Sequence, residues 1–205
     1  MIMIETCSEI MTHAHAVNMI TARDGNVSIR WRSQPYWFIT PANVRKQQLQ
    51  PAMWKKISIG GEILEYTEMS RNLRPSSEYP LHSKLQEKLP ENVESRIVLH
   101  LHPTYTVAAL HRGIKLEELT KDFPELGFHT KVASSVPDVP AKSEVLGDYC
   151  HKNLGLNDDG SVEYDIVGIK GHGVVSIAET PWRAFEHIER LEHICKIVLV
   201  SGVFD

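Results

Sequence analysis

The 205 residues are 42% hydrophobic and 23% charged, a composition typical of globular proteins, and their length suits one domain spanning residues 1–205. The formal net charge of −4 disfavours a nucleic-acid partner, because phosphate backbones select basic surfaces. No apolar run approaches the roughly 18 residues of a membrane span, and the N-terminus lacks the basic start of a signal peptide. We therefore expect a cytoplasmic protein in which Cys7, Cys150 and Cys195 stay reduced.

The first third of the chain alternates helical and strand-like patterns. Apolar residues at helical spacing predict a helix over about 4–21. The Asp-Gly-Asn turn of "RDGNVSIRW" then leads into a strand, and "QPYWFIT" (34–40) predicts a second one. Alternation around a Gly-Gly turn predicts further strand structure in "ISIGGEIL" (57–64).

The middle of the chain places a helix on either side of a strand. A helix opens near Ser76 and Ser77 and closes before Pro90, with leucines at four-residue spacing. The strand is "SRIVLHLH" (95–102), and "PTYTVAALHRG" predicts a second helix that ends at a glycine. We expect 114–140 to be rich in loops, with a weak helical pattern.

The last third predicts a helix, two strands and a long helix. Residues 142–155 form a helix with Gly155 as its C-cap, and "DIVGIKGHGVVSIA" (165–178) forms two short strands around a glycine-rich turn. The final helix, 180–200, has Thr180 as N-cap, an apolar stripe that starts at Trp182, and the i,i+4 pairs Glu186/Arg190 and Glu192/Lys196. Strands mixed with helices indicate a layered α/β domain.

Two histidines in the strand "RIVLHLHPTY" project in one direction. Alternate residues of a strand share a face, so His100 and His102 point the same way with Cα atoms roughly 7 Å apart. Because Zn–N bonds are about 2.0–2.1 Å, one metal ion can bind both rings. Two hydrogen-bonded core histidines are the alternative interpretation of this pair.

His172 and Glu78 are further candidates for the same site. His172 lies between two glycines in "KGHGVVS", where the backbone can turn tightly and present the ring in a fixed direction. Glu78 follows two serines at a helix N-terminus, a position that favours an anion. A hairpin turn with an incidental histidine and an ordinary acidic first turn are the alternatives.

The motifs together, and their order, resemble the class II aldolase/adducin family, typified by L-fuculose-phosphate aldolase and L-ribulose-5-phosphate 4-epimerase. The resemblance runs from about Asn18 to the C-terminus. It rests on five stretches, which are "DGNVSIR", "FITPANV", "RPSSEYPLH", "VLHLHPTYTVAAL" and "GHGVVSIAETPWRAFEHIERLEHICKIVL". The implied fold is a three-layer α/β/α domain with a central, mostly antiparallel sheet, and the implied assembly is a homotetramer.

The resemblance implies a metal site. His100, His102 and His172 correspond to the ligands of one divalent ion per subunit, usually Zn²⁺, and Glu78 corresponds to the catalytic acid/base. Three neutral imidazoles leave the ion its full charge and an open position, as catalytic zinc requires. The implied reaction is reversible aldol cleavage of a small phosphorylated sugar or hydroxy-ketone, through a metal-stabilised enediolate.

The resemblance also implies a cradle for the substrate phosphate. Its residues correspond to Gly25, Asn26, Thr40, Ser76 and Ser77. The helix N-terminus argument reaches the two serines independently.

The sequence departs from the family pattern at two places. Many members have Ser-Gly after Thr-Pro, where this chain has Ala42 and Asn43, so one hydroxyl and one flexible backbone position are lost. Fuculose-phosphate aldolases use a tyrosine from a neighbouring subunit as an acid, and "SSVPDVPAKSEV" contains none. A methylthioribulose-1-phosphate dehydratase, a sugar-phosphate 4-epimerase and a non-enzymatic adducin-like module therefore remain alternatives.

Overall fold

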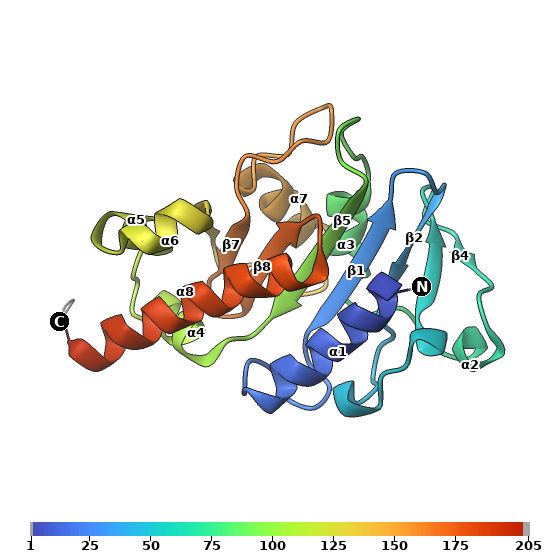
Figure 1. Ribbon diagram of the computed structural model, residues 1–205, viewed down its shortest axis with the longest axis horizontal. Coiled ribbons are helices and arrows are strands. Elements are labelled where there is room, and N and C mark those ends of the chain that lie inside the picture. The colour runs from blue at the N-terminus through green and yellow to red at the C-terminus, as the bar shows by residue number, and fades with distance from the viewer. Residues whose placement is uncertain (1, 203–205) are drawn as a thin grey trace.

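The computed structural model describes residues 2–202, and within them eight strands form one sheet (Figure 1). The strand order is β4-β3-β2-β1-β5-β8-β7-β6. β6 runs parallel to β7, and the other neighbouring strands of the described sheet run antiparallel. The strands are β1 (Asn26–Trp31), β2 (Tyr36–Ile39), β3 (Lys55–Ser58), β4 (Ile63–Leu64), β5 (Ser95–Leu101), β6 (Val132–Val136), β7 (Ile166–Ile169) and β8 (Gly173–Ala178).

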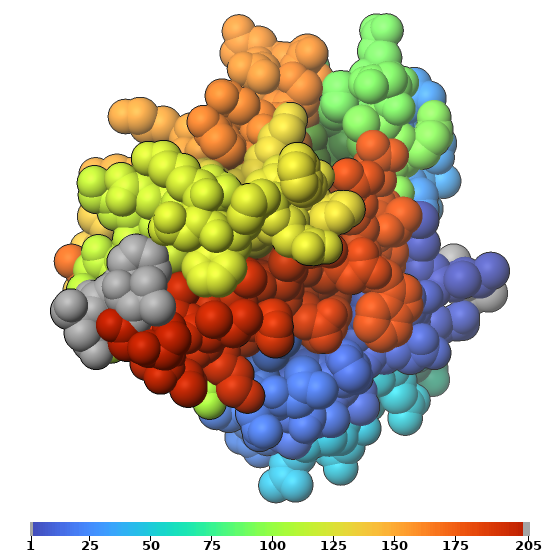
Figure 2. Space-filling view, turned by 60° about the vertical axis from the view of Figure 1, so that its left-hand side comes forward, coloured from blue at the N-terminus to red at the C-terminus, as the bar shows by residue number. Residues whose placement is uncertain are grey.

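Helices cover both faces of this sheet, which confirms the three-layer α/β/α architecture (Figure 1). α1, α4 and α8 pack together on one face, and α3 packs against α7 on the other. In Figure 2, α8 (red) crosses the surface between the yellow segment that contains α5 and α6 and the blue N-terminal segment. The α-helices are α1 (Ile2–Ala16), α2 (Glu68–Arg71), α3 (Tyr79–Gln86), α4 (Thr104–His111), α5 (Leu119–Asp122), α6 (Pro124–His129), α7 (Glu144–Asn153) and α8 (Pro181–Ser201). The short 3₁₀ helices are η1 (Lys46–Gln48), η2 (Pro51–Met53) and η3 (Leu116–Glu118).

The alternation of β5 divides its side chains between two cores. Ile97 and Leu99 belong to the core beneath α1 and α8, whereas Val98 belongs to the core beneath α3 and α7. His100 shares the face of Val98, as the two-residue period of a strand requires. The central strand therefore presents its histidine on the α3 side of the sheet.

Three sequence expectations need correction. The stretch 114–140 is not simply loop, because it contains β6, whose "VASSV" sequence has little apolar alternation and is ordered by its parallel partner β7. The first helix ends at Ala16, since Asn18 takes a left-handed φ of 61°. The third helix, α3, spans only Tyr79–Gln86.

The surface of α8 also differs from the expectation. Trp182 begins the predicted apolar stripe but is 44% exposed. Glu192 does not pair with Lys196; its carboxylate accepts hydrogen bonds from the backbone N–H groups of Tyr105 and Thr106 at 2.9 and 2.7 Å. It thereby satisfies N–H groups in the first turn of α4, which have no partner within that helix.

The three cysteines are free and buried. No helix within residues 2–202 is both long enough and apolar enough to cross a bilayer.

Candidate metal centre

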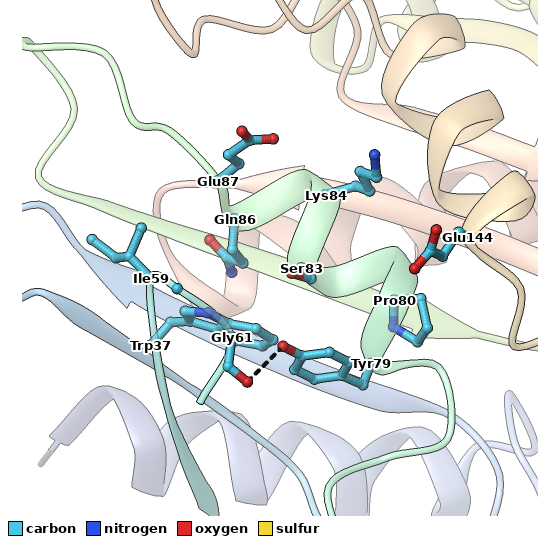
Figure 3. A pocket seen from close by; sticks show the side chains of 11 residues that line it. Trp37, Ile59, Gly61, Tyr79, Pro80, Ser83, Lys84, Gln86, Glu87 and Glu144 are labelled. Atoms are coloured by element: carbon cyan, nitrogen blue, oxygen red, sulfur yellow. Dashed lines mark hydrogen bonds between the residues drawn. The ribbon is translucent and has the colours of Figure 1, made fainter. Parts of the chain in front are cut away.

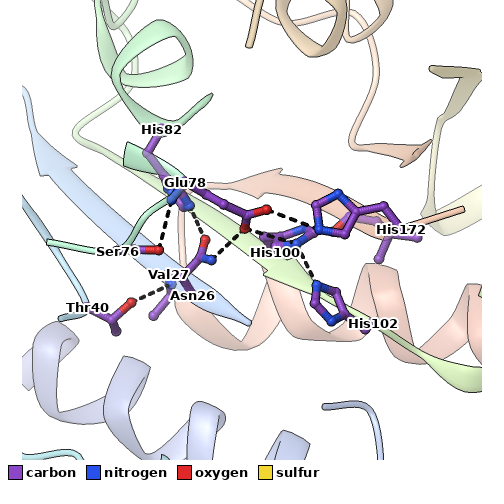
Figure 4. Close-up of polar contacts among 10 residues, drawn as sticks. Asn26, Val27, Thr40, Ser76, Glu78, His82, His100, His102 and His172 are labelled. Atoms are coloured by element: carbon purple, nitrogen blue, oxygen red, sulfur yellow. Dashed lines mark hydrogen bonds and ion pairs between the residues drawn. The ribbon is translucent and has the colours of Figure 1, made fainter. Parts of the chain in front are cut away.

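Three histidines from two distant parts of the sequence meet at one end of β5 (Figure 4). β5 carries His100, His102 follows it directly, and His172 lies in the turn between β7 and β8. One nitrogen from each ring lies within 4.8 Å of the others. The structure therefore brings together the histidines that the sequence singled out, and it places His13 and His15 elsewhere, on α1.

Gly173, next to His172, is packed too closely for any side chain. A Cβ atom at this position would lie 2.4 Å from the carbonyl oxygen of Leu101 and 2.8 Å from Cδ2 of His102. Real Cβ atoms essentially never approach other atoms within 3.0 Å. The glycine after His172 thus lets the turn lie directly against the other two histidines.

The Nε2 atoms of His100 and His102 face each other, and that of His100 presents a lone pair. His100 Nδ1 is 2.9 Å from the carbonyl oxygen of Val174, so this nitrogen carries the proton and Nε2 keeps its lone pair. His102 Nε2 lies 2.8 Å from that Nε2. Burial lowers the pKa of His100, and it lowers the pKa of His102 to about 3, so both rings are neutral at physiological pH.

A carboxylate completes the cluster. Glu78, at the N-cap of α3, places Oε2 3.1 Å from His100 Nε2 and Oε1 3.1 Å from His172 Nε2. His100 donates through Nδ1, so its Nε2 presents a lone pair to Oε2 of the carboxylate, and the two repel unless a cation lies between them. Tetrahedral zinc separates two nitrogen ligands by roughly 3.3 Å, so small shifts of these rings would accommodate the ion. The donor set therefore fits a divalent cation.

The environment of Glu78 keeps it ionised. Burial raises the pKa of this carboxyl, but the charge interaction with His100 and the hydrogen bonds with His172 and Asn26 outweigh burial. The net effect holds the pKa of Glu78 well below its usual range. Asn26 contributes through Nδ2, which donates to Oε2 of the carboxylate at 2.7 Å.

A buried histidine that the sequence analysis left without a role supports this arrangement. His82 lies one helical turn after Glu78, and its Nε2 is hydrogen-bonded to Oδ1 of Asn26 (Figure 4). Its Nδ1 accepts a hydrogen bond from the hydroxyl of Ser28 at 2.7 Å, and the same Oγ accepts from Gln86 Nε2 at 2.9 Å. Burial lowers the pKa of His82 to about 3, so the ring is a neutral link that fixes the Asn26 amide. The i,i+4 spacing from Glu78 was the available signal, because it places both residues on one helix face.

A cavity of about 210 Å³ opens beside the cluster and includes most of the predicted phosphate cradle. Gly25, Asn26, Ser76 and Ser77 line it, together with Glu78, His102 and His172. Gly25 has φ 68°, and a Cβ there would lie 3.0 Å from the carbonyl oxygen of His100, so the glycine also permits close packing behind the metal ligands.

The remaining cradle residue and the altered motif behave differently from the expectation. Thr40 is fully buried, and its Oγ1 accepts a hydrogen bond from the backbone N–H of Val27 at 3.2 Å rather than lining the cavity. Asn43 takes φ 62°, so asparagine preserves a left-handed conformation that the sequence suggested was lost.

A second cavity, of about 390 Å³, lies between α3, β2 and the Gly60-Gly61 turn (Figure 3). Trp37 stacks on Tyr79 at its base, and the Tyr79 hydroxyl donates to the carbonyl oxygen of Gly61 at 3.1 Å. Its lining contains neither histidine nor cysteine. Chemistry rather than volume therefore identifies the smaller cavity as the candidate site.

The fold is shared with solved structures of known enzymes. Residues 5–199 match the family described as Class II Aldolase and Adducin N-terminal domain, and the chain belongs to this family. Its enzymes include aldolases, dehydratases and epimerases, and they usually bind a divalent metal ion.

Individual relatives point to more than one reaction. A methylthioribulose-1-phosphate dehydratase of Acidiphilium cryptum (strain JF-5) is 29% identical over 182 residues, which are 85% of this chain and 79% of that protein. An L-fuculose 1-phosphate aldolase structure aligns with a TM-score of 0.78 at 18% identity, covering 98% of this chain and 87% of the other. A sugar-phosphate aldolase from Thermotoga maritima aligns with a TM-score of 0.76 at 19% identity, covering 99% and 97%.

Proposed function

We propose that His100, His102 and His172 hold one divalent metal ion, Zn²⁺ by preference, and that the protein is a lyase acting on a small phosphorylated sugar. Support for the metal comes from three histidines, one buried and two partly buried, each with a ring nitrogen within 4.8 Å of the others. Three neutral imidazoles with an open fourth position are typical of catalytic zinc. When bound, such an ion supplies Lewis-acid polarisation of a substrate carbonyl and stabilises negative charge on its oxygen.

The protein's own contribution is a proton carrier at the same place. The Glu78 carboxylate is ionised, is 3.1 Å from ring nitrogens of two candidate ligands, and lines the cavity open to substrate. It is therefore positioned to take a proton from the carbon beside a polarised carbonyl and to return it. The position of this carboxylate is the observation that carries the proposal, because loss of a proton from the carbon beside the carbonyl produces an enediolate.

Aldol cleavage is the first reaction that this site supports. Glu78 takes the proton of the hydroxyl on the carbon next to the one beside the carbonyl, the bond between these two carbons breaks, and the electron pair stays as an enediolate. Glu78 then returns the same proton to the enediolate carbon. The second product is an aldehyde. Acids and bases that act on such intermediates need to lie within hydrogen-bond reach of the reacting carbon, as the cavity wall allows for Glu78.

Dehydration is a second candidate, favoured by the identity with the methylthioribulose-1-phosphate dehydratase. Here Glu78 removes the proton from the carbon beside the carbonyl, and the neighbouring hydroxyl leaves as water. The absence of a tyrosine in the stretch 134–145 agrees with a reaction other than that of fuculose-type aldolases. Both candidates share the first carbanionic state, so the same histidines and carboxylate serve either.

We also propose that the protein is a cytoplasmic homotetramer. Family resemblance is the main support for this assembly. Large apolar side chains exposed on neighbouring helices α6 and α8 are consistent with burial by another subunit, namely Phe128, Ile197 and Val200. Light scattering after size-exclusion chromatography tests it, and a monomer at micromolar concentration would reject it.

The first experiment follows proton exchange. The zinc-loaded protein is incubated in D₂O with dihydroxyacetone phosphate, with and without a chelator, and proton NMR follows the hydroxymethyl signal. Stereospecific, chelator-sensitive exchange that is lost in Glu78→Gln supports aldol chemistry. Glu87→Gln is the matched control, because it removes an exposed carboxylate just beyond the other end of α3.

A parallel incubation with methylthioribulose 1-phosphate separates the two reactions. Release of water and formation of a diketone without exchange of dihydroxyacetone phosphate would establish dehydration instead. Absence of both reactions in protein that holds stoichiometric metal would reject the proposed lyase.

A further inference from the structure

The cavity between α3, β2 and the Gly60-Gly61 turn has no role in the proposed reaction, but its wall contains a buried amide with an unused acceptor. Gln86 is 1% exposed and lines this cavity of about 390 Å³. Within residues 2–202, no group donates a hydrogen bond to its Oε1 atom. Burying a carbonyl oxygen without a donor is unfavourable, so an atom of this kind in a cavity wall indicates that another molecule supplies the donor.

The hydrogen bonds of the Gln86 amide fix its orientation. Its Nε2 donates to Oγ of Ser28 at 2.9 Å and to the carbonyl oxygen of Arg96 at 3.3 Å. Turning the amide over would set its oxygen against the Arg96 carbonyl oxygen, which has no proton to donate. The nitrogen therefore faces the sheet, and the oxygen lies on the side of Ile59 and the glycine turn (Figure 3). The unused acceptor is thus directed toward the cavity.

The base of the cavity is a flat apolar surface. Trp37 and Tyr79 stack there with their ring planes at 18° to each other. Trp37 is buried, whereas Tyr79 is partly exposed and presents its ring to the cavity (Figure 3). Because the Tyr79 hydroxyl donates to the carbonyl oxygen of Gly61 at 3.1 Å, the ring is held in place. A rigid aromatic ring of this kind can pack against the C–H face of a cyclic ligand.

The charges around the cavity favour a neutral occupant. Three charged side chains line it, namely Lys84, Glu87 and Glu144. The ammonium of Lys84 already pairs with the carboxylate of Asp148 at 2.9 Å, so the two glutamates leave the rim unfavourable for an anion. Behind the amide, the guanidinium of Arg30 donates to the backbone carbonyl oxygen of Gln86 and disfavours a cation at Oε1.

We propose that this cavity is a separate binding site for a small neutral cyclic polyol. One hydroxyl of the polyol donates to Oε1 of Gln86, another hydrogen-bonds with the hydroxyl of Ser83, and the C–H face of the ring packs on Tyr79. Each hydroxyl can both donate and accept, which suits a wall that offers an amide oxygen and a hydroxyl. The volume lies within the range of small-molecule sites.

The proposed site is independent of the candidate metal centre. None of the residues that line this cavity also lines the cavity beside the histidines. Both cavities border α3, with Glu78 at its start and Gln86 at its end. Polyol binding therefore requires neither metal nor turnover, and it can fail or succeed separately from the proposed lyase reaction.

The test is an NMR titration of the ¹⁵N-labelled, zinc-loaded protein with myo-inositol and with D-glucose. Cyclohexanol is the control ligand, because it has a six-membered ring with a single hydroxyl. We expect each polyol to shift the indole N–H signal of Trp37 and the side-chain amide signals of Gln86 with saturation below about 50 mM. Cyclohexanol should bind at least about fivefold more weakly. Absence of saturable shifts at these signals with both polyols would overturn the proposal.

Three variants test the assigned contacts. Gln86→Leu removes the buried acceptor, and Ser83→Ala removes the hydroxyl of a partly exposed residue. Each should weaken polyol binding by about threefold or more. Glu87→Gln is the matched control, because its carboxylate is turned away from the two rings (Figure 3), and its affinity should stay within about twofold of wild type. If Gln86→Leu does not fold, Ser83→Ala decides, and unchanged affinity in it contradicts the assigned contacts.

A crystal structure of the zinc-loaded protein soaked in myo-inositol identifies the occupant directly. A polyol within hydrogen-bond distance of Oε1 of Gln86 would support the proposal. Nε of Arg30 is another buried atom without a partner in residues 2–202. A water molecule that joins it to Oε1 in a cavity without polyol would overturn the proposal, and so would a neighbouring subunit that fills the cavity.

Discussion

Replacing Gly173 by alanine tests whether the histidine cluster depends on the close approach of the β8 turn. The added Cβ would lie 2.4 Å from the Leu101 carbonyl oxygen and 2.8 Å from Cδ2 of His102. Relieving the first contact to 3.0 Å requires a shift of 3.0 − 2.4, or 0.6 Å, between the turn and β5. The obstacle is backbone, so no flexible side chain can give way.

The size of the effect follows from metal geometry. Metal–ligand distances tolerate changes of only about 0.2 Å, so this shift separates His172 from the other two ligands. Perturbing the orientation of ligands typically lowers metal affinity by about 10–100-fold, which corresponds to about 1.4–2.7 kcal/mol. We expect that loss for zinc, together with a weaker stabilisation of the fold by the metal.

The assay is competition for zinc against a chromophoric chelator, with Gly127→Ala as the control. Gly127 lies in α6, where the nearest atoms to an added Cβ are 3.5 and 3.6 Å away, so alanine fits and zinc affinity should not change. A Gly173→Ala protein whose zinc affinity stays within about twofold of wild type would refute the reasoning, since the turn would then have moved without moving His172.

Three further results are expected. The pKa of Lys46 is about 8 in the folded protein against 10.5 ordinarily, so the unfolded chain binds more protons than the folded protein between these pH values. The free energy of unfolding of the wild type should therefore rise by about 3 kcal/mol as the pH increases across this window. Urea unfolding at several pH values should show no such rise for Lys46→Met. Asn26→Ala removes a hydrogen-bond donor to Glu78 and so raises the pKa of that carboxyl. The acidic limb of the pH–rate profile should then move to higher pH, while the zinc stoichiometry stays unchanged. An acidic limb that does not move would contradict the role of Asn26 in keeping Glu78 ionised. Removal of metal by a chelator should lower the unfolding temperature of wild type but not that of His100→Ala, because a ligand that binds only the folded state stabilises it; equal shifts in both proteins would place the metal elsewhere.

Much of the site could be predicted because its signals are local in the sequence. His100 and His102 share a strand whose two-residue period puts both rings on one face. His172 lies between glycines, and Glu78 lies at the start of a helix, so short sequence motifs indicate the backbone geometry at both positions. The resemblance to the class II aldolase/adducin family then indicated that these four residues form one site, which their spacing in the sequence did not show.

The supporting residues could not be predicted in the same way. His82 reads as one more polar position of α3, and its partners Asn26 and Ser28 are more than fifty residues away in the sequence. Glu192 reads as half of a local pair with Lys196, yet the packing of α8 against α4 places its carboxylate at two backbone N–H groups. β6 has a weak strand pattern and is ordered by hydrogen bonds to β7.

The sequence by itself determined the class of fold, the strands and helices near the site, and the residue types that can bind a metal and carry a proton. These properties depend on hydrophobic period, turn chemistry and side-chain functional groups, which neighbouring residues specify. Only the tertiary structure decided that Lys46 is buried, that Asn26 holds Glu78, and that Gly173 must be glycine. Burial, desolvation and close approach depend on segments far apart in the chain, so they exist only once those segments pack together.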